Sequence, residues 1–179
     1  MKVLWGNNTV LLPLHLQNTW LYKRTSFDSL GTILTSDTIQ CKVNYDTTLL
    51  DEKWYCTFWG FLNNKADGVW HYYGSSSNVQ GIEYTTLHWK YPAEIGYEYK
   101  SSGANAIITV ISIDEDYATP TETFICYHYQ SIYDNTNGYK QDCFICPGIG
   151  LVKWENGITP PSGRSYHTIK YELLTYTIK

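Results

Sequence analysis

Two cysteines separated by two residues are the first candidates for chemistry in this chain. Cys143 and Cys146 have the spacing of a redox pair or of half a zinc site. A redox pair normally lies at the N-terminus of a helix, where the thiolate is stabilised, whereas the apolar residues around this pair are typical of a strand. Positions i and i+3 of a strand point to opposite faces of a sheet, and no second Cys-x-x-Cys or His pair completes a zinc site. We therefore predict that these two thiols do not form a disulfide with each other.

Histidines are the second candidates, as ligands of a metal. The five histidines are His15, His71, His88, His128 and His167. None of them has the spacing of a known metal motif. His71 and His88 lie on strands that we expect to be neighbours, so their rings can meet. Two strand histidines without a third ligand are more typical of a partly exposed surface than of a metal site, and we expect no bound metal.

Motifs of the common enzyme classes are missing from the sequence. It contains no Gly-x-Ser-x-Gly elbow, no phosphate-binding loop and no dinucleotide fingerprint. We therefore expect no catalytic residue and no cofactor.

Aromatic side chains are the remaining signal for a site. The candidate ligand-binding residues are Trp54, Phe58, Trp70, Tyr72 and Trp89. On adjacent strands, alternate members of this group would face one concave surface. Two interpretations stay open: the rings are the core of a bent sheet, or they line a cleft for an apolar or amphipathic ligand. A cleft of this kind should have a volume of roughly 300 Å³ or more and few charges inside.

The elements that would position these residues are short strands. Turn residues interrupt the chain at close intervals, and helical periodicity is almost absent. We predict an all-β domain with little helix, built as a strongly curved antiparallel sheet of about ten or eleven strands that forms an open barrel. Residues 32–45 alternate, and a hairpin with residues 53–61 would place Cys41 opposite Cys56. The redox state of these two thiols and of Cys126 is left open.

A Pro-Gly-x-Gly corner interrupts the strands at Pro147. Proline has no N–H to donate and fixes its own φ, and glycine can adopt the positive φ that a tight corner or bulge needs. We predict that Gly148 or Gly150 has a positive φ. No helix is available to cover the concave face of the sheet, so the loop at residues 74–81 or a bound molecule is expected to cover it.

Length, charge and composition limit the classes of protein further. A chain of 179 residues is expected to be one domain, to which residues 1–11 either belong or form an N-terminal extension. The net charge of −4 and the scattered Lys and Arg exclude nucleic acid as the expected partner. No apolar run approaches the roughly 20 residues of a membrane helix. The first eight residues turn polar too soon for a signal peptide, so the protein is either cytoplasmic or has lost an export signal.

Four stretches resemble motifs of a group of bacterial envelope lipoproteins of uncharacterised role with a LolA/LolB-like open-barrel fold. They are residues 12–22, 90–99, 119–127 and 146–155, the last followed by residues 171–176. Gln17 and Glu122 stand where the group usually has glycine. The resemblance implies export, with a periplasmic or outer-membrane location through an N-terminal lipid anchor that this sequence does not contain.

Composition and resemblance together lead to an expected function. We expect a non-enzymatic envelope domain that binds or carries a lipid-like, hydrophobic or amphipathic ligand. One alternative is an interaction protein whose aromatic surface binds another envelope protein or a glycan. The other alternative is a hydrolase whose site is not visible in the sequence.

Overall fold

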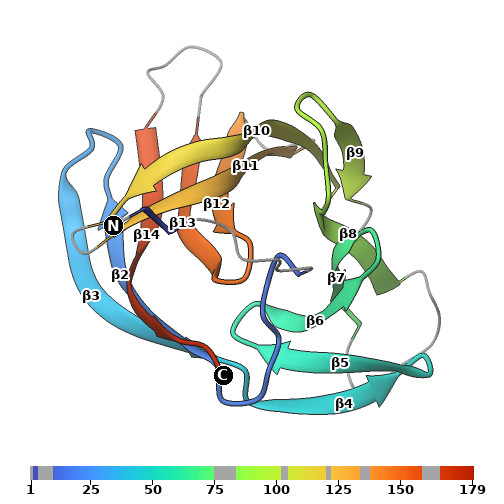
Figure 1. The fold of residues 1–179 in the computed structure, drawn as a ribbon. Coiled ribbons are helices and arrows are strands. Elements are labelled where there is room, and N and C mark those ends of the chain that lie inside the picture. Colours follow the sequence, from blue (N-terminus) through green and yellow to red (C-terminus); the bar gives the residue numbers. More distant parts are fainter. Residues whose placement is uncertain are drawn as a thin grey trace.

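The computed structural model describes residues 2–3, 10–74, 84–101, 105–119, 122–133, 138–158 and 166–179. Over these residues the chain is all-β (Figure 1) and contains no α-helix, and thus no helix that could cross a membrane. The strands are β1 (Lys2–Val3), β2 (Thr19–Phe27), β3 (Ile33–Lys42), β4 (Tyr45–Leu49), β5 (Glu52–Thr57), β6 (Gly60–Lys65), β7 (Gly68–Tyr72), β8 (Thr85–Lys90), β9 (Glu98–Ser101), β10 (Ala106–Ala118), β11 (Thr123–Tyr133), β12 (Tyr139–Cys146), β13 (Gly150–Ile158) and β14 (Tyr166–Thr177).

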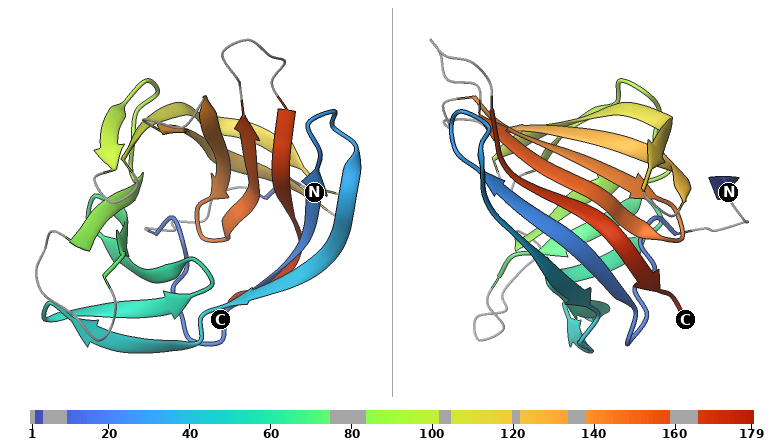
Figure 2. Two further views of the ribbon diagram at one scale, coloured as in Figure 1. Left: turned by 180° about the vertical axis from the view of Figure 1, so that it is seen from behind. Right: turned by 90° about the vertical axis from the view of Figure 1, so that its left-hand side faces the viewer.

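These strands form two sheets that curve around a common interior (Figures 1 and 2). The larger sheet has the order β3-β2-β14-β13-β12-β11-β10-β9, and β1 pairs with β11 in parallel. The smaller sheet is the antiparallel meander β4-β5-β6-β7-β8. The all-β antiparallel class is therefore confirmed, but the strands divide between two sheets where we expected one. In the described part of the chain, no ladder joins β3 to β4 or β8 to β9, so the sheets do not close.

The expected hairpin between residues 32–45 and 53–61 is wrong. β3 pairs with β2, which places Cys41 opposite Trp20, and Cys56 lies opposite Tyr45 of β4. The turn before β3 explains the change, because the Asp28 carboxylate accepts hydrogen bonds from the backbone N–H groups of Leu30 and Thr32, both at 2.8 Å. This turn closes a β2–β3 hairpin instead.

All five cysteines are free thiols, which confirms that Cys143 and Cys146 are not bonded to each other. Cys41, Cys126, Cys143 and Cys146 are buried, and Cys56 is partly exposed. The buried thiols pack as small apolar groups of the core.

The Pro-Gly-x-Gly corner has the predicted positive φ angles. Gly148 has φ +76° and Gly150 has φ +101°, both in the region that favours glycine. The β12–β13 ladder also shifts register between Phe144 and Ile145. The corner is held by two contacts with distant segments: Gly148 N–H donates to the carbonyl of Val10 at 3.0 Å, and the Trp20 indole N–H donates to the carbonyl of Ile149 at 2.7 Å.

The segment before β2 fills the interior between the two sheets. Leu11, Leu12 and Leu14 are buried there, and the Asn64 amide donates to the carbonyl of Leu12 at 2.8 Å. Figure 1 shows this segment, in blue, between β6 and the larger sheet. The chain itself therefore covers part of the concave face, and Leu11 belongs to the core rather than to an extension. Of the loop expected to act as a cover, residues 75–81 lie outside the described residues.

Candidate ligand-binding pocket

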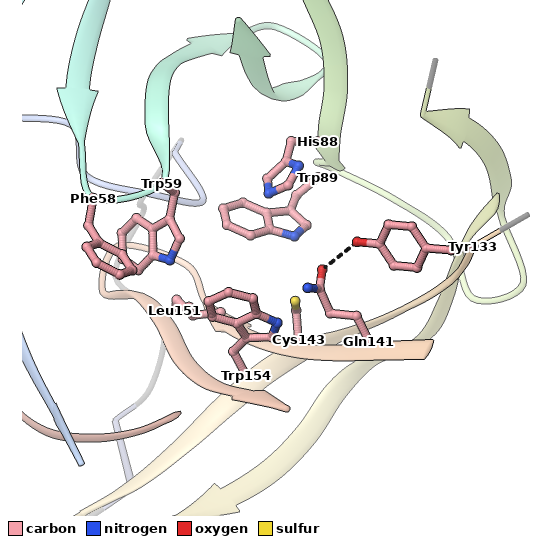
Figure 3. A pocket seen from close by; sticks show the side chains of 9 residues that line it. All are labelled: Phe58, Trp59, His88, Trp89, Tyr133, Gln141, Cys143, Leu151 and Trp154. Carbon is pink, nitrogen blue, oxygen red and sulfur yellow. Dashed lines mark hydrogen bonds between the residues drawn. The ribbon is translucent and has the colours of Figure 1, made fainter. Parts of the chain in front are cut away.

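A pocket of about 290 Å³ lies between the two sheets (Figure 3). Its walls come from the β5–β6 turn and β8 of the smaller sheet, and from β11, β12 and β13 of the larger sheet. The lining residues are Phe58, Trp59, His88, Trp89, Tyr133, Gln141, Cys143, Leu151 and Trp154. None of them is an acid, a lysine or an arginine. The pocket is thus aromatic and uncharged, as ligand pockets for apolar molecules are.

The β5–β6 turn positions the first aromatic wall. Its Thr57 hydroxyl accepts a hydrogen bond from the Trp59 N–H at 3.1 Å and donates one to the Gly60 carbonyl at 2.9 Å. The Trp59 ring then packs edge-on against Trp20, with 6.2 Å between ring centroids. Phe58, which is 45% exposed, stands at the outer side of this wall. A turn closed by its own side chain can hold two large rings without a helix to support them.

β12 and β13 supply the opposite wall. The Trp154 ring stacks on Tyr171 with 4.8 Å between centroids and an interplanar angle of 12°, which fixes the plane of the indole. Cys143 lies beside it. Burial raises the pKa of the Cys143 thiol, and the nearby Asp142 charge raises it further, while a hydrogen bond with Trp89 acts in the opposite direction. The thiol therefore stays protonated and behaves as a small apolar group.

One end of the pocket is polar. The Tyr133 hydroxyl donates to Gln141 Oε1 at 3.3 Å, and Gln141 Nε2 donates to Asn156 Oδ1 at 3.2 Å. Figure 3 shows Tyr133 and Gln141 on the side of the pocket away from Phe58 and Trp59. The pocket thus has an apolar end and a neutral hydrogen-bonding end.

His88 adds an imidazole that is neutral at physiological pH. Its ring centroid lies 4.2 Å from that of Trp89 and 5.6 Å from that of His71, so the two histidines do meet. Burial, and then the neighbouring His71, lower the pKa of His88 to about 3. Among the described residues, no group of three His, Cys, Asp or Glu side chains could hold a metal ion.

The low pKa of His88 predicts a pH-dependent stability. The unfolded chain binds this proton below about pH 6.5 and the folded chain only near pH 3, so stability is complete above pH 6.5 and is lost as the pH falls through this window. Between pH 8 and pH 5 we expect His88 to lower the free energy of unfolding by about 1 to 2 kcal/mol, because its side chain is not fully buried and solvent reduces the full effect. Urea unfolding at the two pH values measures it. Between pH 8 and pH 5, the free energy of unfolding of the His88→Gln variant should fall by correspondingly less than that of the parent.

The matched control for this measurement is His15→Gln, because His15 is exposed. It should retain the pH dependence of the parent protein. Equal losses of stability in the parent and in His88→Gln would contradict the assignment of the effect to His88.

The five sequence candidates do not share one face. Phe58 and Trp89 line the pocket, whereas Trp54, Trp70 and Tyr72 belong to a second cluster on the other face of the smaller sheet. Alternation along β7 separates Trp70 from Val69, and the cross-strand partner of Val69 is Trp89. Trp89 therefore lies on the face opposite to Trp70. That these residues bind a ligand stays a prediction.

Most of the pocket was missed by sequence reasoning. The residues missed are Trp59, His88, Tyr133, Gln141, Cys143, Leu151 and Trp154. Trp59 follows Phe58 directly in the same turn, so the sequence could have indicated it as a second lining residue. The residues of β12 and β13 could be found only by knowing which face of the larger sheet opposes the smaller one.

A second polar cluster lies on the outer face of the larger sheet. His128 Nδ1 is 3.0 Å from Glu115 Oε2, and His128 Nε2 is 2.9 Å from Asp142 Oδ1. The imidazole also stacks on Phe144 with 4.2 Å between centroids. Burial would raise the pKa of Asp142, but hydrogen bonds from His128 and Gln130 outweigh it and lower this pKa to about 2. Both ring nitrogens of His128 are engaged, so the cluster is suited to joining strands rather than to catalysis.

Comparison with known proteins gives similarity of structure only. No protein-family model matches the chain, and no curated protein matches its sequence significantly. A "putative lipoprotein" from Parabacteroides distasonis ATCC 8503 is similar in structure with a TM-score of 0.49 and 12% identity, over 96% of this chain and 100% of that one. A "putative exported protein with YmcC-like fold" from Bacteroides fragilis NCTC 9343 has the same TM-score and identity, over 94% and 99%. At this identity the likeness concerns the fold alone.

Proposed function

We propose that this protein is a non-enzymatic binding module that holds a small hydrophobic or amphipathic molecule between its two sheets. The observation that carries the proposal is the pocket of about 290 Å³, whose lining among the described residues contains three indole rings and no charged side chain. Such a lining binds by burying apolar surface, at roughly 25 cal/mol per Å², and by aromatic contact.

The state of the titratable groups near the pocket supports a role without catalysis. A general base at neutral pH needs a pKa near that pH, and His88 has a pKa of about 3. A nucleophilic cysteine needs a lowered pKa, and burial raises the pKa of Cys143. These two pKa shifts favour the binding role over the hydrolase alternative at this pocket.

We further propose that the protein acts in the bacterial envelope, as an open-barrel carrier of the LolA kind held by a lipid anchor. The motif at residues 146–155, which resembles envelope lipoproteins, supports this location. Fractionation of the source cells tests it, because the native protein should be found with the membranes of the envelope.

Titration with Nile red, an uncharged dye that fluoresces in apolar sites, tests the binding function. We expect saturable binding to the parent protein. Trp89→Leu removes one aromatic wall and should raise the dissociation constant at least about tenfold, which corresponds to about 1.4 kcal/mol. Near-ultraviolet circular dichroism verifies that the variant is folded.

Trp70→Leu is the matched control, because Trp70 lies on the same sheet but on the face away from the pocket. Its indole N–H donates to Asp67 Oδ1 at 2.8 Å. This variant should bind the dye within about twofold of the parent. Equal effects of the two substitutions would place the dye elsewhere and contradict the proposal.

An interaction protein that uses an aliphatic surface, in place of the aromatic surface expected from the sequence, has one observation in its favour. Ile107, Ile111 and Ile132 are 44%, 41% and 53% exposed on β10 and β11, and Ile107 lies directly opposite Ile132. An exposed apolar patch of this kind suits a protein partner. If the parent protein shows no saturable dye binding, the binding-module proposal fails and a protein interaction through this surface is favoured.

A further inference from the structure

We propose that the pocket selects an uncharged, planar ring compound that carries one neutral hydrogen-bonding group, and that Gln141 determines this selectivity. This inference rests on the proposed binding function and specifies its ligand class. It follows from three features of the pocket: its charge, the shape of its walls and the position of its polar end.

Side chains alternate between the two faces of β12 and β13, and the charged ones lie on the face away from the pocket. Cys143 and Trp154 line the pocket, whereas Asp142, Phe144 and Lys153 point to the outer face. There Asp142 contacts His128, and the Lys153 ammonium lies 4.6 Å from the centre of the Phe144 ring. An ionised ligand would thus lose its hydration and gain no counter-charge from the lining, which opposes its binding.

The walls favour a flat ring. Trp59, Trp89 and Trp154 surround the space from three elements, as Figure 3 shows. Aromatic pairs stabilise a complex beyond the area they bury, an advantage that a flexible acyl chain does not have. The volume of about 290 Å³ is also at the lower end of the range for small-molecule pockets and is too small for a whole lipid with two chains.

The polar end requires a neutral group. A carboxamide offers two N–H donors and two oxygen lone pairs. In Gln141 one N–H donates to Asn156 and one lone pair accepts from Tyr133, so among the described residues one donor and one acceptor of this carboxamide remain for a ligand. An amide or hydroxyl on the ligand can use both, whereas a carboxylate can only accept. The geometry therefore matches an aromatic amide or alcohol.

Two probes of the same size separate charge from shape. 2-Naphthamide is neutral at pH 7.5 and 2-naphthoate is an anion, and each is titrated against bound Nile red. We expect 2-naphthamide to bind at least tenfold more tightly than 2-naphthoate. Trp89→Leu should weaken the binding of 2-naphthamide as much as it weakens the binding of the dye. This result would place both probes in the same pocket.

Substitution of Gln141 tests its role in selectivity. Gln141→Leu should raise the dissociation constant of 2-naphthamide about fivefold to tenfold. It should leave the dissociation constant of Nile red within twofold of the parent value. The matched control is Gln130→Leu on the outer face, where the Gln130 amide donates to Asp142 Oδ1 at 2.9 Å; it should change neither affinity. Thermal unfolding of both variants verifies that they are folded.

The outcomes distinguish the inference from the function on which it rests. Saturable dye binding together with equal or tighter binding of 2-naphthoate would overturn the ligand class and leave the binding function intact. An unchanged affinity of Gln141→Leu for 2-naphthamide would overturn the role of Gln141. Lack of dye binding by the parent would overturn both the function and this inference.

Discussion

Replacing Gly150 with alanine should lower the free energy of unfolding by about 2 to 5 kcal/mol. Gly150 has φ +101°, where an L-residue is strained, and a Cβ built on it would lie 2.5 Å from Leu12 Cδ1. The Trp20 indole is the next neighbour at 3.4 Å and is itself fully buried. The positive φ strains the backbone of an alanine at this position, and the new Cβ overpacks the core against Leu12. The variant therefore has both costs. Urea unfolding at pH 8 measures the loss.

Gly31→Ala is the matched control for Gly150→Ala. Gly31 also has a positive φ, +83°, but a Cβ there would meet no atom within 4 Å. Its substitution should cost only the backbone strain, about 1 to 2 kcal/mol. A cost for Gly150→Ala that equals this value would show that the contact with Leu12 relaxes and that packing adds nothing.

Truncating Leu12 to alanine should lower stability by about 2 to 5 kcal/mol, as expected for a fully buried leucine. Leu12 has no exposed surface, and it packs beneath the Pro-Gly-x-Gly corner in the interior between the sheets. Leu16→Ala, a leucine 37% exposed in the same segment, should cost less than about 1 kcal/mol. Similar costs for the two variants would mean that the segment does not fill the interior.

The contact between Leu12 and Gly150 also predicts a coupling between their substitutions. The cavity left by Leu12→Ala can receive the new Cβ, so Gly150→Ala should cost less in the Leu12→Ala background. We expect an interaction free energy of at least about 1 kcal/mol in a double-mutant cycle. Additive effects would contradict the packing of this segment against the corner.

This packing limits what the pocket can hold. The segment around Leu12 occupies the interior next to the corner, and Leu151, which follows the corner, lines the pocket. Part of the concave face is therefore covered by the chain before β2, a cover that we did not expect from the sequence. In the described part of the chain, the space for a ligand in this pocket lies between Trp59, Trp89 and Trp154.

Properties that depend on a few neighbouring residues could be predicted from the sequence. Glycine next to proline in a corner requires positive φ, and Gly148 and Gly150 have it. Alternation in a strand separates Cys143 from Cys146, and these thiols are free. Turn spacing and the lack of helical periodicity indicated the all-β class. Each of these follows from local stereochemistry, which the residues carry with them.

Properties that depend on the pairing of distant strands were decided only by the tertiary structure. Cys41 lies opposite Trp20 and not Cys56, because an alternating strand does not specify its partner. Trp89 faces the pocket and Trp70 does not, because the register of β7 with β8 sets the face. The three walls of the pocket come from segments of the chain that have no local relation to one another. Long-range packing assembled the candidate site, whereas local stereochemistry determined the strands that carry it.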